Sequence, residues 1–429
     1  MNDTDLSRIE GFRQLKQEIR GSDRHLIVGI DIAKSKHHAF LGTANGRTVL
    51  KGLIFENSRQ GLEKLLTRVQ FYMDRDGFRE VVFGVEPTSV YHKPLAEKLI
   101  EHGHMVVYVT NEAIKKNRSL LDGRWDKNDT KDAANIADLV SRGKFLYYDY
   151  PSGSISQLRQ LLSLRRRLKK EEHSLRMRIR NNLLAQYFPE LDPFYKACER
   201  ESLAIVGWCL DRSKIAGMEF DEFFSMVTRS KRGIAQKKRL EKIHRLAVES
   251  VGCRMWPAVE FEASLLVQKL NDVRRQLDQI KDLMEDICRQ FDQYPLLLTI
   301  PGFGPYICAR VIASIASPLR FDSGKQLLKM AGYDLGASRS GQRSDKVVPV
   351  ISKRGNSELR YALYQAAHIA SIHNPDFVGY FTRMLRGRER ERGIKTKMRV
   401  KLAAKMLIIA WTLMKKRIEF NPDFLLTEE

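Results

Sequence analysis

The fold of the first third of the chain is decided by residues 25–56, which read HLIVGIDIAKSKHHAFLGTANGRTVLKGLIFE. The stretch opens with a short apolar run rich in Val and Ile, which is typical of a buried strand. Two further runs, HHAFLGT and RTVLKGLIF, flank Asn45-Gly46, a pair that predicts a tight hairpin in which both turn residues have positive φ. The sequence therefore predicts one strand followed by a β-hairpin.

Helices and strands then alternate as far as about residue 145. The segments predict, in order, a helix at NSRQGLEKLLTRVQFYM with Asn57 as candidate cap, a strand at EVVFGVE, a helix at KPLAEKLIEHG ending at Gly103, a strand at MVVYVT and a helix at DTKDAANIADLVSRG. A strand and a hairpin followed by alternating helices and strands is the order expected of an α/β RNase H-like domain.

The rest of the chain predicts mainly helices. Residues 152–187 form a long helical stretch with nine basic residues against Glu171 and Glu172, and its charged face is either solvated or follows a nucleic-acid backbone. From Leu266 to Ile287, apolar residues recur at spacings of four and three, which is a heptad pattern. That seam pairs either with the 152–187 stretch in an antiparallel hairpin or with a second copy of the chain in a coiled coil.

These patterns divide the chain into four parts. We expect a polar N-terminal extension at residues 1–22 and an RNase H-fold domain at residues 23–150. A helical and coiled-coil region follows at residues 151–291, with an insertion at about residues 190–260 in which we find no chemical motif. The mainly helical C-terminal domain covers residues 292–429.

The composition favours a polyanionic partner. The chain has 429 residues and a net charge of +22. Because the basic runs are interleaved with structured motifs, nucleic acid is favoured over a merely solvated surface or attraction to a membrane. The five cysteines are scattered without a C-x-x-C pair, which argues against zinc and disulfides and for a reducing cytoplasm. The longest apolar stretch, near Leu402 to Met414, is too short to cross a bilayer and contains Lys405, so we expect no membrane association.

Acidic residues on separate predicted elements form the first candidate site: Asp31, Glu86, Asp129 and Asp132. Metal-assisted phosphodiester cleavage needs carboxylates from different segments, and Mg²⁺ prefers a few carboxylates plus water and substrate oxygens. Taken singly, Asp129 is explained as a helix N-cap and Asp132 as a first-turn acid. Taken together, in RNase H order, the four predict a site for one or two Mg²⁺ ions.

A polar loop, AGYDLGASRSGQRS, carries the second candidate site. Ser340 precedes Gly341, and Arg339 and Arg343 lie beside it. A serine that attacks phosphate needs help from a metal, Arg or Lys. By itself, however, a Ser-Gly pair in a loop is more often a turn, and no His/Asp pairing points to a hydrolase triad.

Further residues are candidates for nucleic-acid contacts. Leu298 to Ala316 predicts a hairpin and a helix similar to a helix-hairpin-helix element, in which Gly302 and Gly304 can present backbone N–H groups to a phosphate. Basic residues surround the next helix start: Lys353, Arg354 and Arg360. From Arg383 to Lys405 ten basic residues stand against two acids, which also predicts phosphate contacts.

Together these motifs resemble those of the DEDD transposases of bridge-RNA-guided insertion sequences. GIDIAKSKH resembles the first catalytic strand, VEPTSVYH the glutamate motif and KNDTKDA the paired-aspartate motif; IPGFGPYICA, AGYDLGASRSG and SKRGNSELRYAL resemble the C-terminal signatures. The resemblance covers about residues 25–145 and 265–415. Asn128 departs from the threonine usual in the family, and Thr88-Ser89-Val90 departs from its glycine-containing stretch.

The resemblance implies more than the residues do alone. It implies that Asp31, Glu86, Asp129 and Asp132 bind metal and that Ser340 is a covalent nucleophile. It also implies phosphoserine intermediates, a Holliday junction, and selection of donor and target DNA by a structured bridge RNA. The active sites would be composite within a tetramer built as a dimer of dimers, acting at the nucleoid in a prokaryotic cytoplasm.

Two other hypotheses remain open. The first is a RuvC-type endonuclease that resolves Holliday junctions with the four acids and water only. The second is a non-enzymatic nucleic-acid scaffold with a degenerate RNase H fold, against which the presence of all four acids speaks.

Overall fold

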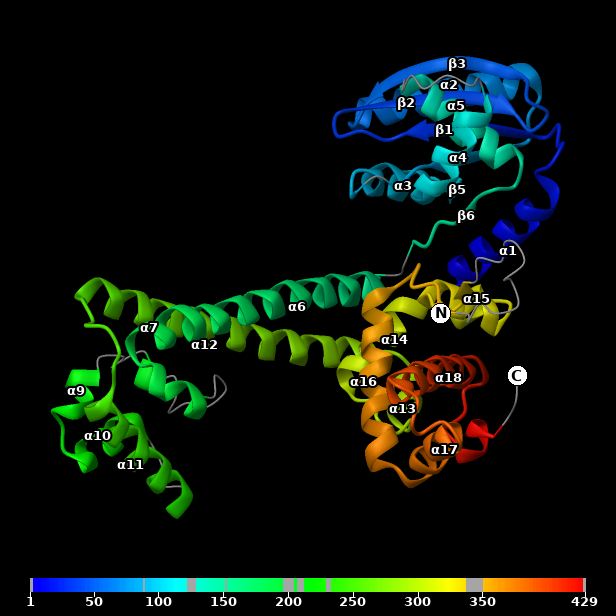
Figure 1. The fold of residues 1–429 in the computed structure, drawn as a ribbon. Helices are drawn as coiled ribbons and strands as arrows, with labels where there is room; N and C mark the ends of the chain where they lie inside the picture. Colours follow the sequence, from blue (N-terminus) through cyan, green and yellow to red (C-terminus); the bar gives the residue numbers. More distant parts are fainter. Residues whose placement is uncertain are drawn as a thin grey trace, which may run out of the picture. The chain divides into compact units, whose positions relative to one another are not determined.

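The chain forms two compact units, Met1–Pro151 and Ser152–Glu429, each of which is described by itself. The structure is a computed structural model, shown as a ribbon in Figure 1. It describes residues 3–87, 89–121, 129–150, 153–195, 204–206, 212–228, 233–336 and 350–426.

The first unit is built on a six-stranded mixed sheet with the order β3-β2-β1-β4-β5-β6. The strands are β1 (His25–Asp31), β2 (Lys36–Thr43), β3 (Thr48–Glu56), β4 (Glu80–Val85), β5 (Met105–Tyr108) and β6 (Leu146–Tyr147). Strand β2 pairs antiparallel with both β1 and β3, while β1, β4 and β5 run parallel and β6 closes the edge antiparallel to β5. The predicted α/β architecture of this part is confirmed.

Helices cover both faces of the sheet because side chains alternate along each strand. On one face, α2 (Arg59–Asp76) and α3 (His92–Glu101) share a core with Leu26, Val28 and Ile30 of β1. On the other, α1 (Asp3–Glu18), α4 (Asn111–Leu121) and α5 (Asp129–Ser141) share a core with Ile27 of β1. Helix α4 was not predicted from the sequence. Helix α1 contributes the buried Leu15 to the unit, and the buried Ile19 directly follows the helix.

Gly29 is the residue that lets α5 lie directly on the sheet. A Cβ atom at this position would stand 2.2 Å from the carbonyl oxygen of Ala133 and 2.6 Å from the backbone nitrogen of Ala137. Both contacts are with helix backbone, which cannot move aside as a flexible side chain would. The absence of a side chain at Gly29 therefore sets the distance between α5 and β1.

Two local predictions were wrong in detail. In the β2–β3 turn Gly46 has positive φ and Asn45 does not, and the Gly46 N–H donates to the Thr43 carbonyl. The connection between Thr43 and Thr48 therefore contains one left-handed glycine, and such longer hairpin loops are a common alternative to the two-residue turn. The cap of α2 is Ser58, whose Oγ accepts from the Gly61 N–H at 3.1 Å. Asn57 donates instead from its side chain to the Lys34 carbonyl.

The second unit begins with two long helices that lie side by side in Figure 1, α6 (Gly153–Arg178) and α12 (Pro257–Cys288). Leu158 and Leu162 of α6 share a core with Val273 and Leu277 of α12. Of the two arrangements predicted for the heptad seam, the structure therefore contains the pairing within one chain. Beyond α6 the chain continues through η1 (Ile179–Leu184) and α7 (Ala185–Tyr187).

The described part of the 190–260 segment has a core of its own. Its elements are η2 (Pro189–Phe194), α9 (Arg212–Ala216), α10 (Phe220–Val227) and α11 (Ile234–Glu249). Phe223 and Leu240 are fully buried there with Leu266 and Leu270, the first two residues of the seam on α12. The seam is thus shared between two cores rather than facing one partner helix along its length.

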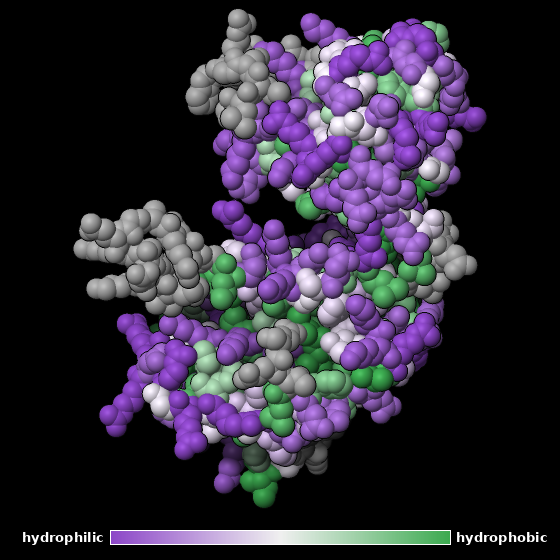
Figure 2. Space-filling model, turned by 90° about the vertical axis from the view of Figure 1, so that its right-hand side faces the viewer, coloured by the Kyte–Doolittle hydropathy of each residue, from purple (hydrophilic) through white to green (hydrophobic). Residues whose placement is uncertain are grey.

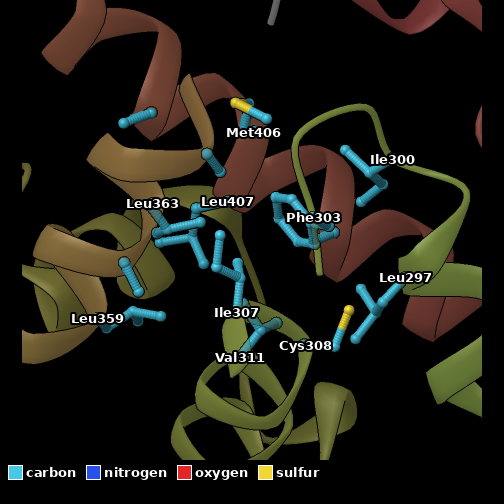
Figure 3. Packing of buried hydrophobic residues seen from close by; sticks show 14 of the residues in the cluster. Leu297, Ile300, Phe303, Ile307, Cys308, Val311, Leu359, Leu363, Met406 and Leu407 are labelled. Carbon is cyan, nitrogen blue, oxygen red and sulfur yellow. The ribbon is translucent and has the colours of Figure 1, made fainter. Parts of the chain in front are cut away.

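The C-terminal part is mainly helical, as predicted. Its elements are α13 (Gln293–Leu298), α14 (Pro305–Ile315), η3 (Pro318–Arg320), α15 (Gly324–Ala331), β7 (Leu335–Gly336), β8 (Val350–Ile351), α16 (Ser357–His373), α17 (Pro375–Leu385), α18 (Ile394–Lys416) and η5 (Pro422–Leu425). Figure 3 shows its core, where Ile307 of α14, Leu363 of α16 and Leu407 of α18 meet. The long apolar stretch near residues 402–414 is buried in α18, and no described helix is long and apolar enough to cross a membrane.

We predict that Gly29→Ala loosens α5. The added methyl group must displace helix backbone, and overpacking of this kind lowers stability by about 1–3 kcal/mol. Hydrogen exchange of the α5 and β1 amides should accelerate accordingly. Gly379→Ala in α17 is the matched control, because no atom lies within 4 Å of its added Cβ. Unchanged exchange in α5 of the Gly29 variant would contradict the proposed role of the glycine.

Candidate active site

Asp31 and Glu86 lie at the ends of two neighbouring parallel strands. Asp31 is the last residue of β1, Glu86 directly follows β4, and the register pairs Ile30 with Val85. By alternation, Asp31 follows Ile27 and Gly29 on the face that carries α5, and Glu86 follows Val82 and Gly84 on the same face. Both are half-buried. The structure thus brings these two predicted acids together.

Helix α5, which carries the other two acids in the sequence, lies on that face. It begins at Asp129, whose side chain lies outside the described part of the chain, and Asp132 follows one turn later. The next residue, Ala133, has its carbonyl against Gly29, two positions before Asp31 in β1. Asp132 therefore stands on the segment of α5 that crosses β1 near its carboxyl end.

The carboxylate of Asp132 is held by an arginine. Its side chain is only 4% exposed and forms an ion pair with Arg118 of α4. The Arg118 Nε and Nη2 atoms both donate to Oδ1, at 3.0 and 2.6 Å. A buried carboxylate needs such a partner, because an isolated charge loses its hydration when it is buried. In this structure the partner is a guanidinium group.

A second polar contact set fixes α4 against α5. The buried Asn117 donates from Nδ2 to Asn135 Oδ1 at 2.8 Å and to Asp138 Oδ2 at 2.7 Å. Asn135 in turn donates to the Ile114 carbonyl at 2.9 Å. Because each of these buried amide groups has partners, the network stabilises one arrangement of the two helices.

The chemistry of these donors fits a hard divalent cation, since all four are carboxylates. Their arrangement fits only in part. Asp31 and Glu86 lie at adjacent strand ends, while Asp132 is paired with Arg118. Among the residues that the structure describes, no group of three or more His, Cys, Asp or Glu side chains stands ready to hold a metal ion.

Sequence reasoning missed three residues near Asp31 and Asp132. Arg118 lies on the unpredicted helix α4. His38 pairs with Asp31 in the antiparallel β1–β2 register, so the two side chains share a face. His37 is fully buried, accepts a hydrogen bond at Nδ1 from the Ala33 N–H, and its pKa is lowered by burial. A neutral His37 therefore supports the turn that follows Asp31. In the sequence, only the HH pair shortly after Asp31 could have signalled this.

The predicted nucleophile, Ser340, lies outside the described residues, as do Arg339 and Arg343. The chain on either side of that segment is described. Strands β7 and β8 pair antiparallel, with Gly336 opposite Val350. Shortly after β8, Lys353 and Arg354 are exposed. The described residues Gly336 and Val350 therefore lie side by side, and two exposed cations follow in the chain.

Arg360 differs from these two cations. Its Nη1 atom donates to the Ala331 carbonyl at the end of α15, at 2.7 Å, and its own carbonyl accepts from the Tyr333 hydroxyl. The side chain thus joins α16 to the end of α15. In this structure Arg360 joins two helices, which is a different role from the predicted phosphate contact.

The element predicted to resemble a helix-hairpin-helix consists of α13, a turn and α14. Gly302 has positive φ, and a Cβ there would lie 2.5 Å from the Ala366 carbonyl of α16, so the glycine is required for packing. Gly304 is the N-cap residue of α14, and a Cβ there would meet no atom within 4 Å. Of the two glycines, only Gly304 has free space beside its backbone, which a phosphate would need to approach it.

Part of the positive charge on α6 holds the unit together. Arg159 donates to the Ala313 carbonyl at 2.7 Å, Arg166 pairs with Glu358 at 3.2 Å, and the Arg165 guanidinium lies 4.0 Å from the Tyr306 ring centroid. These contacts join α6 to α14 and α16. Other charged side chains reach the surface, and Figure 2 shows that hydrophilic residues cover most of the visible face.

The chain matches two family models of transposases. One, of the IS110 DEDD type and described as "Transposase", covers residues 28–189; the other, described as "Transposase IS116/IS110/IS902 family", covers residues 294–382. The chain is 23% identical to a protein of insertion element IS116 of Streptomyces clavuligerus, over 94% of this chain and 98% of that protein. It is also 23% identical to a protein of the IS117 mini-circle of Streptomyces coelicolor, named as a candidate transposase, over 71% of this chain and 75% of that protein.

We predict that Lys353→Gln and Arg360→Gln separate nucleic-acid binding from folding. Loss of one phosphate contact at the exposed Lys353 lowers the slope of log affinity against log salt by about 0.9, with no change in thermal stability. Loss of the Arg360 bond to α15 lowers the melting temperature instead. DNA-binding titrations at several salt concentrations, with thermal melts of both variants, check this. An unchanged salt slope for Lys353→Gln would remove that residue from the interface.

Proposed function

The chain belongs to the IS110/IS116 family of DEDD transposases, and from that premise we propose that it cuts and exchanges DNA strands with a serine nucleophile and four metal-binding acids. The observation that carries the proposal is the position of Asp31 and Glu86 at adjacent ends of two parallel strands, on the sheet that α5 crosses. The strand order and directions of the sheet, with an antiparallel β1–β3 meander beside parallel β4 and β5, support an RNase H-like (RuvC-like) domain.

Asp31, Glu86, Asp129 and Asp132 are the residues that would hold one or two Mg²⁺ ions. Bound there, Mg²⁺ would neutralise charge on the scissile phosphate and assist the attacking and leaving oxygens. The protein supplies the framework for that chemistry. Gly29 allows α5 to approach β1, the parallel register aligns Asp31 with Glu86, and α4 holds α5 through its buried amide network.

Ser340 supplies the nucleophile in this proposal. Its Oγ forms a bond to the phosphorus while one backbone P–O bond breaks, which leaves a phosphoserine and a free DNA hydroxyl. Arg339 and Arg343 would offset the negative charge that develops on the phosphate. The paired strands β7 and β8 and the exposed Lys353 and Arg354 support a phosphate-facing role for this loop.

The remaining features of the proposed reaction rest on the resemblance of the sequence motifs to those of the family. We propose donor and target DNA as substrates, a structured bridge RNA as guide, a Holliday-junction intermediate, and composite active sites in a tetramer. The same proposal includes the division of the chain into four parts, with boundaries at residues 22, 150 and 291. It also includes action at the nucleoid of a prokaryotic cytoplasm. The net charge of +22 supports it, because a protein that binds two nucleic acids must offset many phosphates.

We predict that Ser340→Ala abolishes covalent capture of DNA. The wild-type protein, incubated with Mg²⁺, element-end DNA and RNA copurified from its host, should form an adduct that mass spectrometry maps to Ser340. Ser344→Ala, which removes a neighbouring hydroxyl from the same loop, should retain the adduct. Cleaved DNA without an adduct in the wild type would instead favour a resolving endonuclease that uses the four acids and water.

We predict that Asp31→Asn abolishes strand cleavage while nucleic-acid binding stays within about twofold of wild type. The substitution removes one charge from the strand end without adding volume. Gel-shift and cleavage assays on the same preparation separate the two properties. Glu80→Gln is a suitable control, since Glu80 is an exposed acid at the opposite end of β4. Strand exchange at the wild-type rate in Asp31→Asn would refute the metal assignment.

A further inference from the structure

We propose that Arg118 is a positioning residue that holds Asp132 in the metal-free protein and releases it when a divalent cation binds. The inference rests on the proposed function, because it takes Asp31, Glu86, Asp129 and Asp132 as the metal-binding set. It adds a residue that the acidic motifs do not contain. It also explains why the Asp132 carboxylate is paired with a cationic group in this structure.

The geometry of the pair favours exchange. Both donated hydrogen bonds, from Nε and Nη2 of Arg118, end on Oδ1 of Asp132. Arg118 therefore does not form the two parallel bonds, one to each oxygen, that make arginine–carboxylate pairs most specific. The Asp132 side chain is 4% exposed, whereas that of Arg118 is 31% exposed. The carboxylate is fixed in the interior, and its partner reaches it from the solvent side.

Helix α4 does not depend on this ion pair for its place. The adjacent residue, Asn117, is 5% exposed and bonded to Asn135 and Asp138, and Asn135 is bonded back to the Ile114 carbonyl. When the Arg118 bonds break, these contacts still join α4 to α5. The guanidinium group can thus turn toward solvent by side-chain rotation alone.

Electrostatics connects the exchange to the metal-binding set. Asp132 precedes Ala133, whose carbonyl lies against Gly29 in the strand that ends with Asp31. Either a guanidinium group or a divalent cation offsets the cost of burying the negative charge of the Asp132 carboxylate. When both contact the same carboxylate, the two positive groups repel each other. Arg118 therefore holds the Asp132 side chain in place without metal, and it lowers the apparent affinity for metal.

The test measures Mg²⁺ binding to the full chain in the absence of nucleic acid. Mg²⁺ is titrated into EDTA-treated protein, and the binding heat and the melting temperature are recorded. In Arg118→Gln we expect the half-saturating Mg²⁺ concentration to fall roughly fivefold or more, the size of a typical coupling between two binding events. The same variant should melt at a lower temperature without metal and show a larger Mg²⁺-induced rise.

Three further variants make the result specific. Arg142→Gln breaks the more exposed pair between Arg142, which follows α5, and Asp138 of α5, and it should leave the Mg²⁺ titration unchanged. Arg118→Lys keeps a positive charge and should fall between wild type and Arg118→Gln. If Arg118→Gln does not fold, Arg118→Gln with Asp132→Asn removes the unpaired buried charge. That double variant should regain metal-free stability and lose the enhanced response to Mg²⁺.

The outcomes separate the two proposals. If Asp31→Asn weakens Mg²⁺ binding but Arg118→Gln leaves it unchanged or weakens it, the exchange is overturned and the metal site stands. If neither wild type nor any variant responds to Mg²⁺, the metal assignment fails and the exchange fails with it. Tighter Mg²⁺ binding in Arg118→Gln alone, with the Arg142 control unchanged, supports the exchange.

Discussion

The close packing of α5 on β1 at Gly29 is the constraint on which the candidate site depends. Helix backbone occupies the volume where a side chain would stand, which brings the segment with Asp132 and Ala133 directly onto the strand that ends at Asp31. The parallel pairing of β1 with β4 then places Glu86 alongside. Without that contact, the acids would lie on elements separated by a layer of side chains.

The polar groups between α4 and α5 complete this arrangement. Apolar packing fixes how deep a helix lies but specifies its rotation less strictly, whereas satisfied buried hydrogen bonds require one rotation. Asn117, Asn135 and Asp138 meet this requirement, and Arg118 adds a charge next to Asp132. The same helix pair therefore orients an acid of the site and neutralises it.

In the second unit, charge and packing are combined differently. The long helices α6 and α12 share one core with the C-terminal helices and a second with the described part of the 190–260 segment. Basic residues of α6 such as Arg159 and Arg166 contact α14 and α16. A basic run on a helix is thus in part a structural feature here, and only its remaining charges are available to a polyanion.

The sequence by itself predicted strands β1 to β5 and helices α2, α3 and α5 of the first unit, because periodicity and turn residues are local properties. It did not predict the short strand β6. It also determined the family, since six short motifs occur in the right order. The tertiary structure decided that the heptad seam pairs within the chain, that Arg360 joins α15 to α16, and that Arg118 holds Asp132. The sequence could not specify these contacts, because each joins residues on different helices. Their partners depend on how the helices pack, and periodicity describes one element at a time.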